Sequence, residues 1–258
     1  MNFLKFCSLL TILAGAATLA AQNTAPESAP VAATTVGTGF DYSRGSYGFA
    51  TDTEIFSVPL NLGFDNGPWS TNLNFSYLTL KGPATVVAGS GAARPTSSSQ
   101  SGFGDIYAGV TYHFGPAFGA VNLDATARVK LATANESRGL GTGQTDYYGE
   151  LTVSRTLGTT TPFATAGYRV LGDSAVYQLR DGAYLSGGAH FRVSPTNVIT
   201  AVLDWRQPIT VGAKHEVDAT AMFTHDFDAN WRIAAYVLKG FTDASPDLGT
   251  GVQLSHRF

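Results

Sequence analysis

Charged side chains that could bind a ligand recur at every second position of otherwise apolar stretches. In the stretch 121–131, Asp124, Arg128 and Lys130 alternate with apolar residues. Because successive side chains of a β-strand point to opposite faces, each such stretch would place its charges on one face. The same pattern over the whole chain gives one candidate set, which is Asp124, Arg128, Lys130, Glu150, Arg169, Arg192, Asp204 and Arg206. Side chains of mixed charge on one face can pair with one another or line a polar path.

The five histidines are the candidates for acid–base catalysis. A lipid hydrolase needs a histidine and a serine within hydrogen-bond reach. His190 lies in mid-strand among the charged positions, and with Glu150 it forms the least implausible catalytic pair. The other histidines lie at the ends of predicted strands, and the loop beside His215 contains no serine. We therefore do not expect an enzyme, and no catalytic residue is predicted.

Nothing in the sequence predicts a metal ion or a cofactor. The glycine run 139–143 resembles a phosphate-binding loop only superficially, because no helix follows it, and glycine hinges in a long loop explain it better. No Cys/His cluster and no calcium-loop spacing is present. The net charge of −3 gives no electrostatic footprint for nucleic acid. We therefore expect no cofactor, no metal and no nucleic-acid partner.

The N-terminus has the three-part layout of a secretory signal peptide. Lys5 supplies a positive charge, an apolar run extends from Phe6 to about Leu13, and small residues continue to Ala21. This layout predicts a cleaved signal peptide at 1–20, which would remove the only cysteine of the chain. The next segment is rich in Ala, Pro, Ser and Thr and has no periodicity. We interpret 21–34 as a flexible periplasmic leader.

The remaining chain alternates apolar and polar residues with a period of two. The predicted strands are 35–44, 52–64, 69–81, 103–114, 118–132, 145–157, 161–171, 182–193, 197–206, 215–227, 230–240 and 248–258. Strands of this length and pattern are typical of barrels that span a membrane. In such a barrel each Lys or Arg facing lipid at mid-depth costs ~2 to 4 kcal/mol, so the charged face of each strand must face the lumen. The pattern predicts that 35–258 is all-β and forms a transmembrane antiparallel up-and-down β-barrel of about 12 strands. Its expected location is the bacterial outer membrane, in contact with outer-membrane lipid.

Short turns alternate with longer loops along this predicted barrel, which places both termini on the periplasmic side. Aromatic residues beside the short turns are expected at the membrane interface, and they are Phe64, Trp69, Phe114, Trp231 and Phe258. The last predicted strand alternates apolar and polar residues and has Phe258 as its final residue. Such strands are typical of those that the barrel-assembly machinery recognises. His256 departs from that pattern, because its outward position is usually aromatic or aliphatic.

Three stretches in the middle third of the chain resemble a family of bacterial outer-membrane transporters labelled for the meta-pathway of phenol degradation. The stretch Ser101–Tyr112 is similar to the Gly-x-Gly-Asp strand opening of that family. Val129–Tyr147 is similar to its next strand and glycine-rich loop, with Ala132 in place of the usual proline. Thr161–Asp173 is similar to its following hairpin. The resemblance implies an outer-membrane barrel of transporter type and assigns no role to individual residues.

We therefore expect an outer-membrane channel or transporter that passively admits a small solute through a charge-lined lumen. The solute would be aromatic or otherwise hydrophobic if the family resemblance extends to it. The first alternative is a closed structural or adhesion barrel that acts through its outer loops. The second alternative is an outer-membrane enzyme that modifies lipid.

Overall fold

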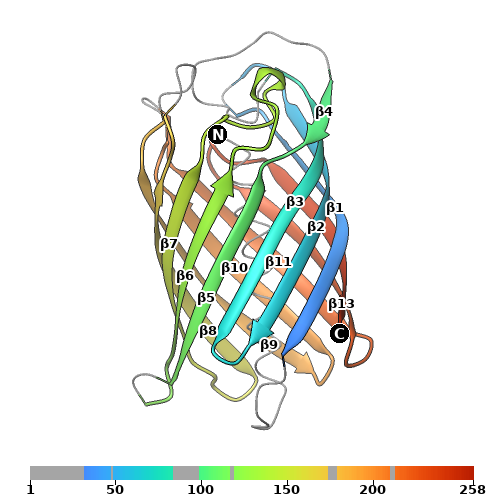
Figure 1. The fold of residues 1–258 in the computed structure, drawn as a ribbon, viewed down its shortest axis with the longest axis vertical. Helices are drawn as coiled ribbons and strands as arrows, with labels where there is room; N and C mark the ends of the chain where they lie inside the picture. Colours follow the sequence, from blue (N-terminus) through green and yellow to red (C-terminus); the bar gives the residue numbers. More distant parts are fainter. Residues whose placement is uncertain (1–31, 48, 84–98, 117–118, 174–178, 210–212) are drawn as a thin grey trace.

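The computed structural model describes residues 32–47, 49–83, 99–116, 119–173, 179–209 and 213–258. They form a barrel of tilted antiparallel strands (Figure 1). Its strands are β1 (Ala33–Gly45), β2 (Thr53–Asn66), β3 (Trp69–Lys81), β4 (Gln100–Phe103), β5 (Ile106–Pro116), β6 (Asn122–Leu131), β7 (Asp146–Ser154), β8 (Thr160–Val170), β9 (Gly182–Ser194), β10 (Asn197–Arg206), β11 (Glu216–Asp226), β12 (Trp231–Gly240) and β13 (Leu248–Arg257). A short 3-10 helix, η1 (Glu136–Arg138), follows β6. None of the described residues belongs to a helix long and apolar enough to cross a membrane.

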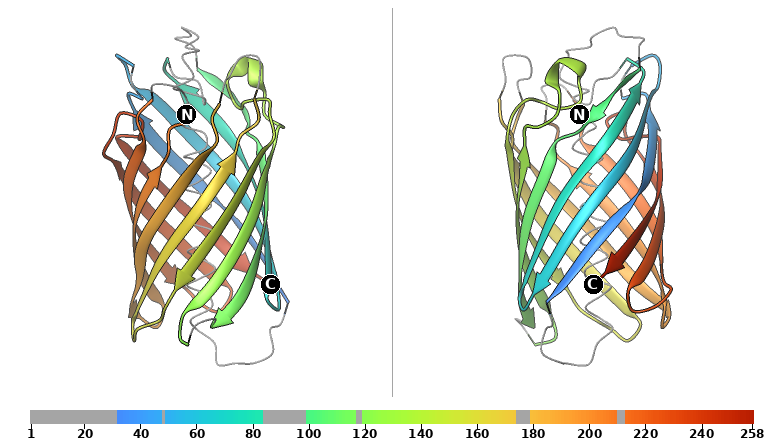
Figure 2. Two further views of the ribbon diagram at one scale, coloured as in Figure 1. Left: turned by 90° about the vertical axis from the view of Figure 1, so that its left-hand side faces the viewer. Right: turned by 45° about the vertical axis from the view of Figure 1, so that its right-hand side comes forward.

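The sheet closes on itself by main-chain pairing. The first strand pairs with the last, from Thr35 opposite Arg257 to Arg44 opposite Leu248. In the described part of the chain, β4 and β5 both pair with β3 and act as one interrupted strand, so the barrel has 12 strands. Figure 2 shows the continuous wall from two other sides. The prediction of an all-β, antiparallel, up-and-down barrel of about 12 strands is confirmed.

The fourth predicted strand is wrong in one respect, because the structure breaks it after Phe103 and resumes it at Ile106. The cause is Asp105, which lies in the break and binds the backbone of another segment. Its Oδ1 accepts hydrogen bonds from the N–H groups of Thr133 at 3.0 Å and Ala134 at 2.9 Å. These two bonds from backbone donors to one carboxylate oxygen compensate in part for the interrupted ladder.

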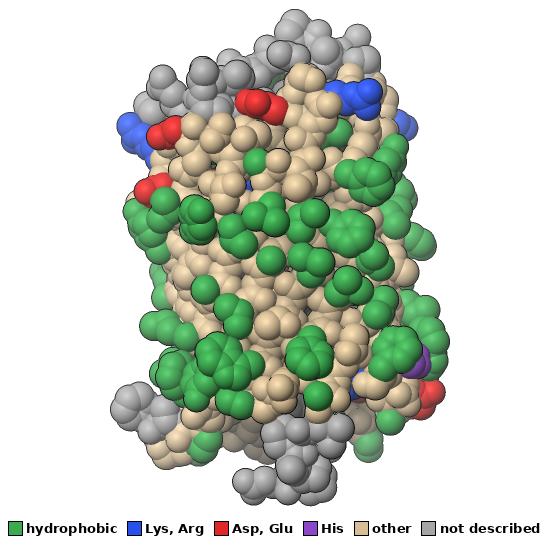
Figure 3. Space-filling model, in the orientation of Figure 1, with side chains coloured by type: hydrophobic (Ala, Val, Ile, Leu, Met, Phe, Trp, Pro, Cys, Tyr) green, Lys and Arg blue, Asp and Glu red, His purple; other side chains and the backbone are tan. Residues whose placement is uncertain are grey.

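Inward and outward side chains alternate along the strands, as the period of two requires. In β7, Asp146 and Tyr148 point inward and are buried, whereas Tyr147, Leu151 and Val153 point outward and are exposed. Figure 3 shows hydrophobic side chains across the visible exterior, with charged side chains gathered toward the two ends. An exterior of this kind is suited to lipid, because lipid tails solvate apolar side chains.

The two ends of the barrel have different connections. We call the end where β1 begins and β13 finishes the turn end, and the opposite end the loop end. Short turns join β2 to β3 and β7 to β8 at the turn end, and their Gly67 and Gly158 have φ values of 58° and 64° that favour glycine. The chain end also lies there, because the Phe258 N–H donates to the Thr34 carbonyl oxygen at 2.8 Å.

The boundaries of several segments differ from expectation. The segment 1–20 and all of 21–34 except its last residues lie outside the described residues, so the signal peptide and the leader stay predictions. The barrel begins at Ala33, two residues before the expected start. Strand β6 begins at Asn122 instead of 118, after a turn in which Gly119 has a φ of 73°.

Candidate functional site: the charged lumen

The candidate charged residues lie on the inner face of the barrel. Those less than one-tenth exposed are Asp124, Arg128, Lys130, Arg169, Asp204 and Arg206. Glu150 and Arg192 are partly exposed. Most of them belong to separate clusters at different heights of the lumen, and the contacts within each cluster are described in turn.

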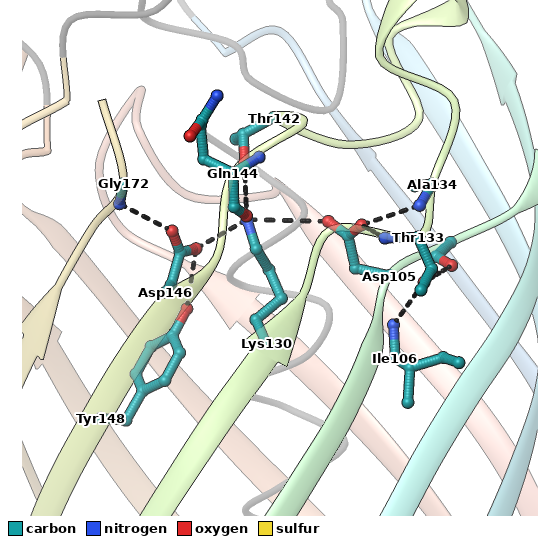
Figure 4. A network of polar contacts seen from close by, with 11 residues as sticks. Asp105, Ile106, Lys130, Thr133, Ala134, Thr142, Gln144, Asp146, Tyr148 and Gly172 are labelled. Carbon is teal, nitrogen blue, oxygen red and sulfur yellow. Dashed lines mark hydrogen bonds and ion pairs between the residues drawn. The ribbon is translucent and has the colours of Figure 1, made fainter. Parts of the chain in front are cut away.

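At the loop end, Lys130 holds two carboxylates together. Its Nζ lies 2.7 Å from Asp146 Oδ2 and 3.6 Å from Asp105 Oδ2, and these side chains are at most 2% exposed. The same ammonium donates a hydrogen bond to Thr142 Oγ1 at 2.6 Å. Figure 4 shows Lys130 between the two carboxylates, with Gly172 donating its N–H to Asp146 Oδ1 at 3.0 Å. This cluster joins β6 to the loops that follow β6 and β8.

The loop after β6 folds into the lumen, and we call residues 132–145 the inner loop. Its Leu140 is 1% exposed and packs against inward side chains of β2 and β3, namely Ile55, Leu78 and Leu80. A Cβ atom on Gly102 would lie 2.7 Å from Leu140 Cδ1, so the glycine in β4 leaves room for this side chain. The inner loop therefore narrows the loop end beside β2 to β4.

The glycine run 139–143 supplies the hinges of the inner loop. Gly139 caps η1 with a φ of 71°, and Gly143 has a φ of 68°. Both lie in the left-handed region that glycine occupies without strain. Because β7 and not a helix follows the run, the backbone fits the hinge interpretation and not a phosphate loop.

A second apolar group, which we call the mouth cluster, lies over the lumen at the loop end. Its buried members are Tyr47, Tyr107, Tyr148, Leu171, Leu179, Ile209 and Ala244. Two of them, Tyr107 and Tyr148, come from strands, and their ring centroids are 6.5 Å apart. The others come from four different connections around the ring. Side chains from so many positions can form one cluster only where their loops converge over the lumen.

Arg206 faces three carboxylates on β10 and β11. Its guanidinium nitrogens lie 2.9 Å from Asp218 Oδ2, 3.4 Å from Glu216 Oε2 and 3.7 Å from Asp204 Oδ1. Each carboxylate keeps a second, buried oxygen that has no hydrogen-bond partner among the described residues. The cluster therefore carries more negative than positive charge and keeps acceptors for water or for a solute.

A third group crosses β6, β7 and β9. The Nη2 atom of Arg128 lies 3.7 Å from Glu150 Oε2, and its guanidinium stands 5.0 Å from the centroid of the Tyr148 ring. Glu150 also accepts a hydrogen bond from the Tyr184 hydroxyl at 2.8 Å. Arg169 is bound differently, because its Nη2 donates to the Gln207 carbonyl oxygen at 2.6 Å. Arg128 and Glu150 thus form an ion pair beside two tyrosines, whereas Arg169 is held by a backbone carbonyl.

At the turn end, the structure aligns a serine, a histidine and an aspartate. His113 Nδ1 lies 2.8 Å from Asp124 Oδ1, and its Nε2 lies 2.9 Å from Ser70 Oγ. The Ser70 hydroxyl, however, also donates to Asp65 Oδ1 at 2.7 Å. A catalytic triad needs the serine proton directed to the imidazole, and here a carboxylate competes for it. We interpret these residues as a polar wall of the lumen.

Sequence reasoning missed this contact, because Ser70 and His113 are 43 positions apart and come from paired strands. The stagger of β3 against β5 brings them together, and no local pattern shows it. His190 and Glu150, the least implausible catalytic pair in the sequence, do not contact each other. His190 Nδ1 bonds to Thr200 Oγ1 at 2.9 Å and its ring stacks on Phe163, whereas Glu150 binds Arg128 and Tyr184.

The predicted interface aromatics all lie on the exterior near the turn end, where they are exposed, and they are Phe64, Trp69, Phe114, Trp231 and Phe258. His256 lies among them. Its ring makes edge contacts with Trp231 at 4.6 Å and with Phe258 at 4.4 Å between centroids. We call these exposed aromatic residues the aromatic girdle. The His256 ring packs among them as another aromatic ring would, so the last strand keeps a continuous row of rings at this position.

Within the part of the chain that the structure describes, no group of three or more His, Cys, Asp or Glu side chains is arranged to hold a metal ion. No protein-family model matches the sequence, and no curated protein is significantly similar to it. The resemblance to the family labelled for phenol degradation therefore stays a prediction.

The fold is similar to those of solved outer-membrane barrels. An outer membrane channel from Pseudomonas putida F1 superposes with a TM-score of 0.66 at 13% identity, over 90% of this chain and 97% of that one. The NanC porin has a TM-score of 0.54 at 7% identity, covering 86% and 98% of the two chains. The translocator domain of the autotransporter NalP from Neisseria meningitidis has a TM-score of 0.51 at 10% identity, covering 98% of each. This chain therefore has the fold of bacterial outer-membrane β-barrels.

Proposed function

We propose that the protein is a channel of the bacterial outer membrane that passively admits a small solute through its lumen. The observation that carries this proposal is a set of buried polar atoms on the inner wall without hydrogen-bond partners among the described residues. They include Asp204 Oδ2, Asp218 Oδ1 and Arg169 Nε. Leaving such atoms unsatisfied in a dry interior costs about 1 to 3 kcal/mol each, so they favour a lumen that water and solutes reach.

The mouth cluster supports a solute with an apolar or aromatic part. Tyr107 and Tyr148 present rings inside the barrel, and Tyr184 packs against the same cluster. Ligand sites commonly combine such apolar surfaces with a few polar groups that orient the ligand. The likeness to the Pseudomonas putida channel supports passive transport, and diffusion through a pore requires no cofactor. We propose that lipid contacts the aromatic girdle and that the assembly machinery recognises β13.

A closed barrel that acts through its outer loops is the second candidate. The observation that favours it is the coverage of the loop end by the inner loop and the mouth cluster. In this case the charged lumen would be a space-filling, ion-paired interior.

Electrical recording separates the two candidates. We expect purified, folded protein to produce discrete conductance steps in planar lipid bilayers. Replacing the lumen residue Arg169 by Gln should change the reversal potential in a salt gradient, because a fixed charge is removed from the path. The matched control is Arg155→Gln, which removes the same charge from an exposed exterior position at the turn end. Folded protein that shows no steps at any voltage would refute the channel.

A further inference from the structure

A small cavity lies in the lumen wall at the turn end. Its volume is about 60 Å³, and its lining residues are Thr156, Gly158, Thr159, Thr161, His190, Arg192 and Val198. Three strands meet there, because Thr161 in β8 pairs with His190 in β9, and His190 pairs with Thr200 in β10. The β7–β8 turn forms another side of the cavity.

His190 is held rigidly in the wall of this cavity. Its ring stacks on Phe163 with centroids 4.8 Å apart and an interplanar angle of 22°. Its Nδ1 is engaged with Thr200 Oγ1 at 2.9 Å. The Nε2 atom is buried and has no hydrogen-bond partner among the described residues, and the residue is only 4% exposed. A buried polar atom without a hydrogen bond costs free energy, so a ligand that forms a hydrogen bond with Nε2 would be stabilised at this position.

The other polar groups of the cavity suit an anion. Arg192 supplies a guanidinium, which binds planar carboxylates with two parallel hydrogen bonds. Thr156, Thr159 and Thr161 supply hydroxyl groups, those of Thr156 and Thr161 lying 3.3 Å apart, and none of the described lining residues is acidic. Val198 closes the cavity with an apolar surface. The described lining therefore contains a cation, hydroxyl groups and the imidazole Nε2 of His190, and no carboxylate.

We propose that this cavity binds the carboxylate group of a small organic acid that passes through the lumen. The inference rests on the proposed channel function and names the class of its solute. The volume limits what enters, since it is well below the ~150 Å³ of an engineered protein cavity that binds benzene. A carboxylate therefore fits in the cavity while the remainder of the solute stays in the lumen.

Carboxylates elsewhere in the lumen determine the side from which the subsite is reached. Arg206 and Lys130 near the loop end face three and two carboxylates, respectively. At the turn end, Asp65 and Asp124 bind Ser70 and His113, so the loop-end half repels an anion more strongly. An organic acid added on the turn side meets the cavity without passing those clusters. We therefore expect a carboxylate to act faster from the turn side of a bilayer.

The test compares benzoate with benzyl alcohol, a neutral molecule of similar size, on folded protein in detergent and in bilayers. Benzoate should bind in calorimetry and should reduce the KCl current, whereas benzyl alcohol should do neither to the same extent. Arg192→Gln and His190→Phe should each weaken benzoate binding roughly tenfold, the effect of losing about one hydrogen bond to a charged group. His190→Phe keeps a ring against Phe163, and Arg155→Gln on the exterior should leave binding unchanged.

The outcomes separate failure of the subsite from failure of the channel. Conductance steps combined with unaltered benzoate binding in the folded Arg192→Gln and His190→Phe variants would overturn the subsite and leave the channel standing. Chloride that displaces benzoate at equal concentration would also overturn it, because the cavity would then hold simple anions. Absence of both conductance and benzoate binding would overturn both proposals. Migration in gels before and after heating verifies that each variant is folded.

Discussion

Replacing Lys130 by methionine tests whether the loop-end cluster holds the inner loop in the lumen. Methionine keeps the length of the side chain and removes its ammonium. In the wild type the ammonium lies 3.6 Å from Asp105 Oδ2 and 2.7 Å from Asp146 Oδ2. The change leaves both carboxylates buried without this shared cation. It also removes the donor to Thr142 Oγ1 in the inner loop. Both consequences favour movement of the loop away from the lumen.

The expected loss of unfolding free energy is about 3 kcal/mol, at the lower end of the range for breaking one side of a buried ion pair. The lower end applies because each carboxylate keeps other donors. Asp105 retains the N–H groups of Thr133 and Ala134, and Asp146 retains the N–H of Gly172. These backbone bonds stabilise the charged form of each carboxylate after the lysine is gone.

The assay is urea unfolding of the folded barrel, followed by the fluorescence of its three tryptophans, with single-channel conductance recorded on the same preparation. The control is Lys214→Met, which breaks the 2.6 Å contact between Lys214 and Asp243 at the loop end. Both of these side chains are more than 60% exposed, so the control should change stability by less than about 1 kcal/mol. Adding Asp146→Asn to Lys130→Met should recover part of the lost stability, since one orphaned charge is removed.

The conductance of the Lys130→Met channel should rise as the inner loop leaves the lumen. A loss of stability no larger than that of the control would refute the buried-pair argument. A large loss of stability with wild-type conductance would show instead that Lys130 stabilises the barrel without holding the loop.

Three further changes test other parts of the structure. Leu140→Ala should lower the free energy of unfolding in urea by about 2 to 5 kcal/mol, because it leaves a cavity between the inner loop and strands β2 and β3. A decrease below about 1 kcal/mol, as for an exposed substitution, would show that the inner loop does not pack there. Arg206→Met should shift the reversal potential toward cation selectivity, because three carboxylates lose their counterion; an unchanged potential would remove this cluster from the path. Hydrogen bonds from the N–H groups of Trp231 and Asn230 lower the pKa of Asp228 in the β11–β12 turn. The ionised Asp228 therefore stabilises the folded state at pH values above its ordinary pKa. This stabilisation is lost as the pH falls through the lowered pKa, so the wild type and Asp228→Asn should have the same melting temperature in acid.

The strand content could be predicted from the sequence because its determinants are local. A period of two identifies a strand with two different faces, and the cost of charge in lipid assigns the charged face to the lumen. Turn residues such as Gly67 and Gly158 mark the ends, since their backbone conformations favour glycine. These rules predict a barrel of about 12 strands, which the structure confirms.

The contacts inside the lumen could not be predicted, because they depend on the stagger between strands. Asp105 looked like an ordinary inward residue of one strand, yet it breaks that strand to bind the backbone of Thr133 and Ala134. The inward position of Leu140 depends on apolar residues more than 55 positions away in β2 and β3. Alternation gives the face of a side chain and not its partner, so pairs such as Ser70 and His113 require the three-dimensional register.

Two charged residues at the turn end, Asp65 and Arg192, lie on opposite sides of the lumen. Asp65 lies on β2, and Arg192 lies on β9, six strands further around a ring of 12. Strands separated by half the ring stand on opposite walls. Fixed charges of opposite sign on facing walls create a field across the pore, and in a narrow lumen with low-dielectric walls this field is weakly screened. A carboxylate would therefore be repelled by the β2 wall and attracted to the β9 wall, even though the chain as a whole carries net negative charge.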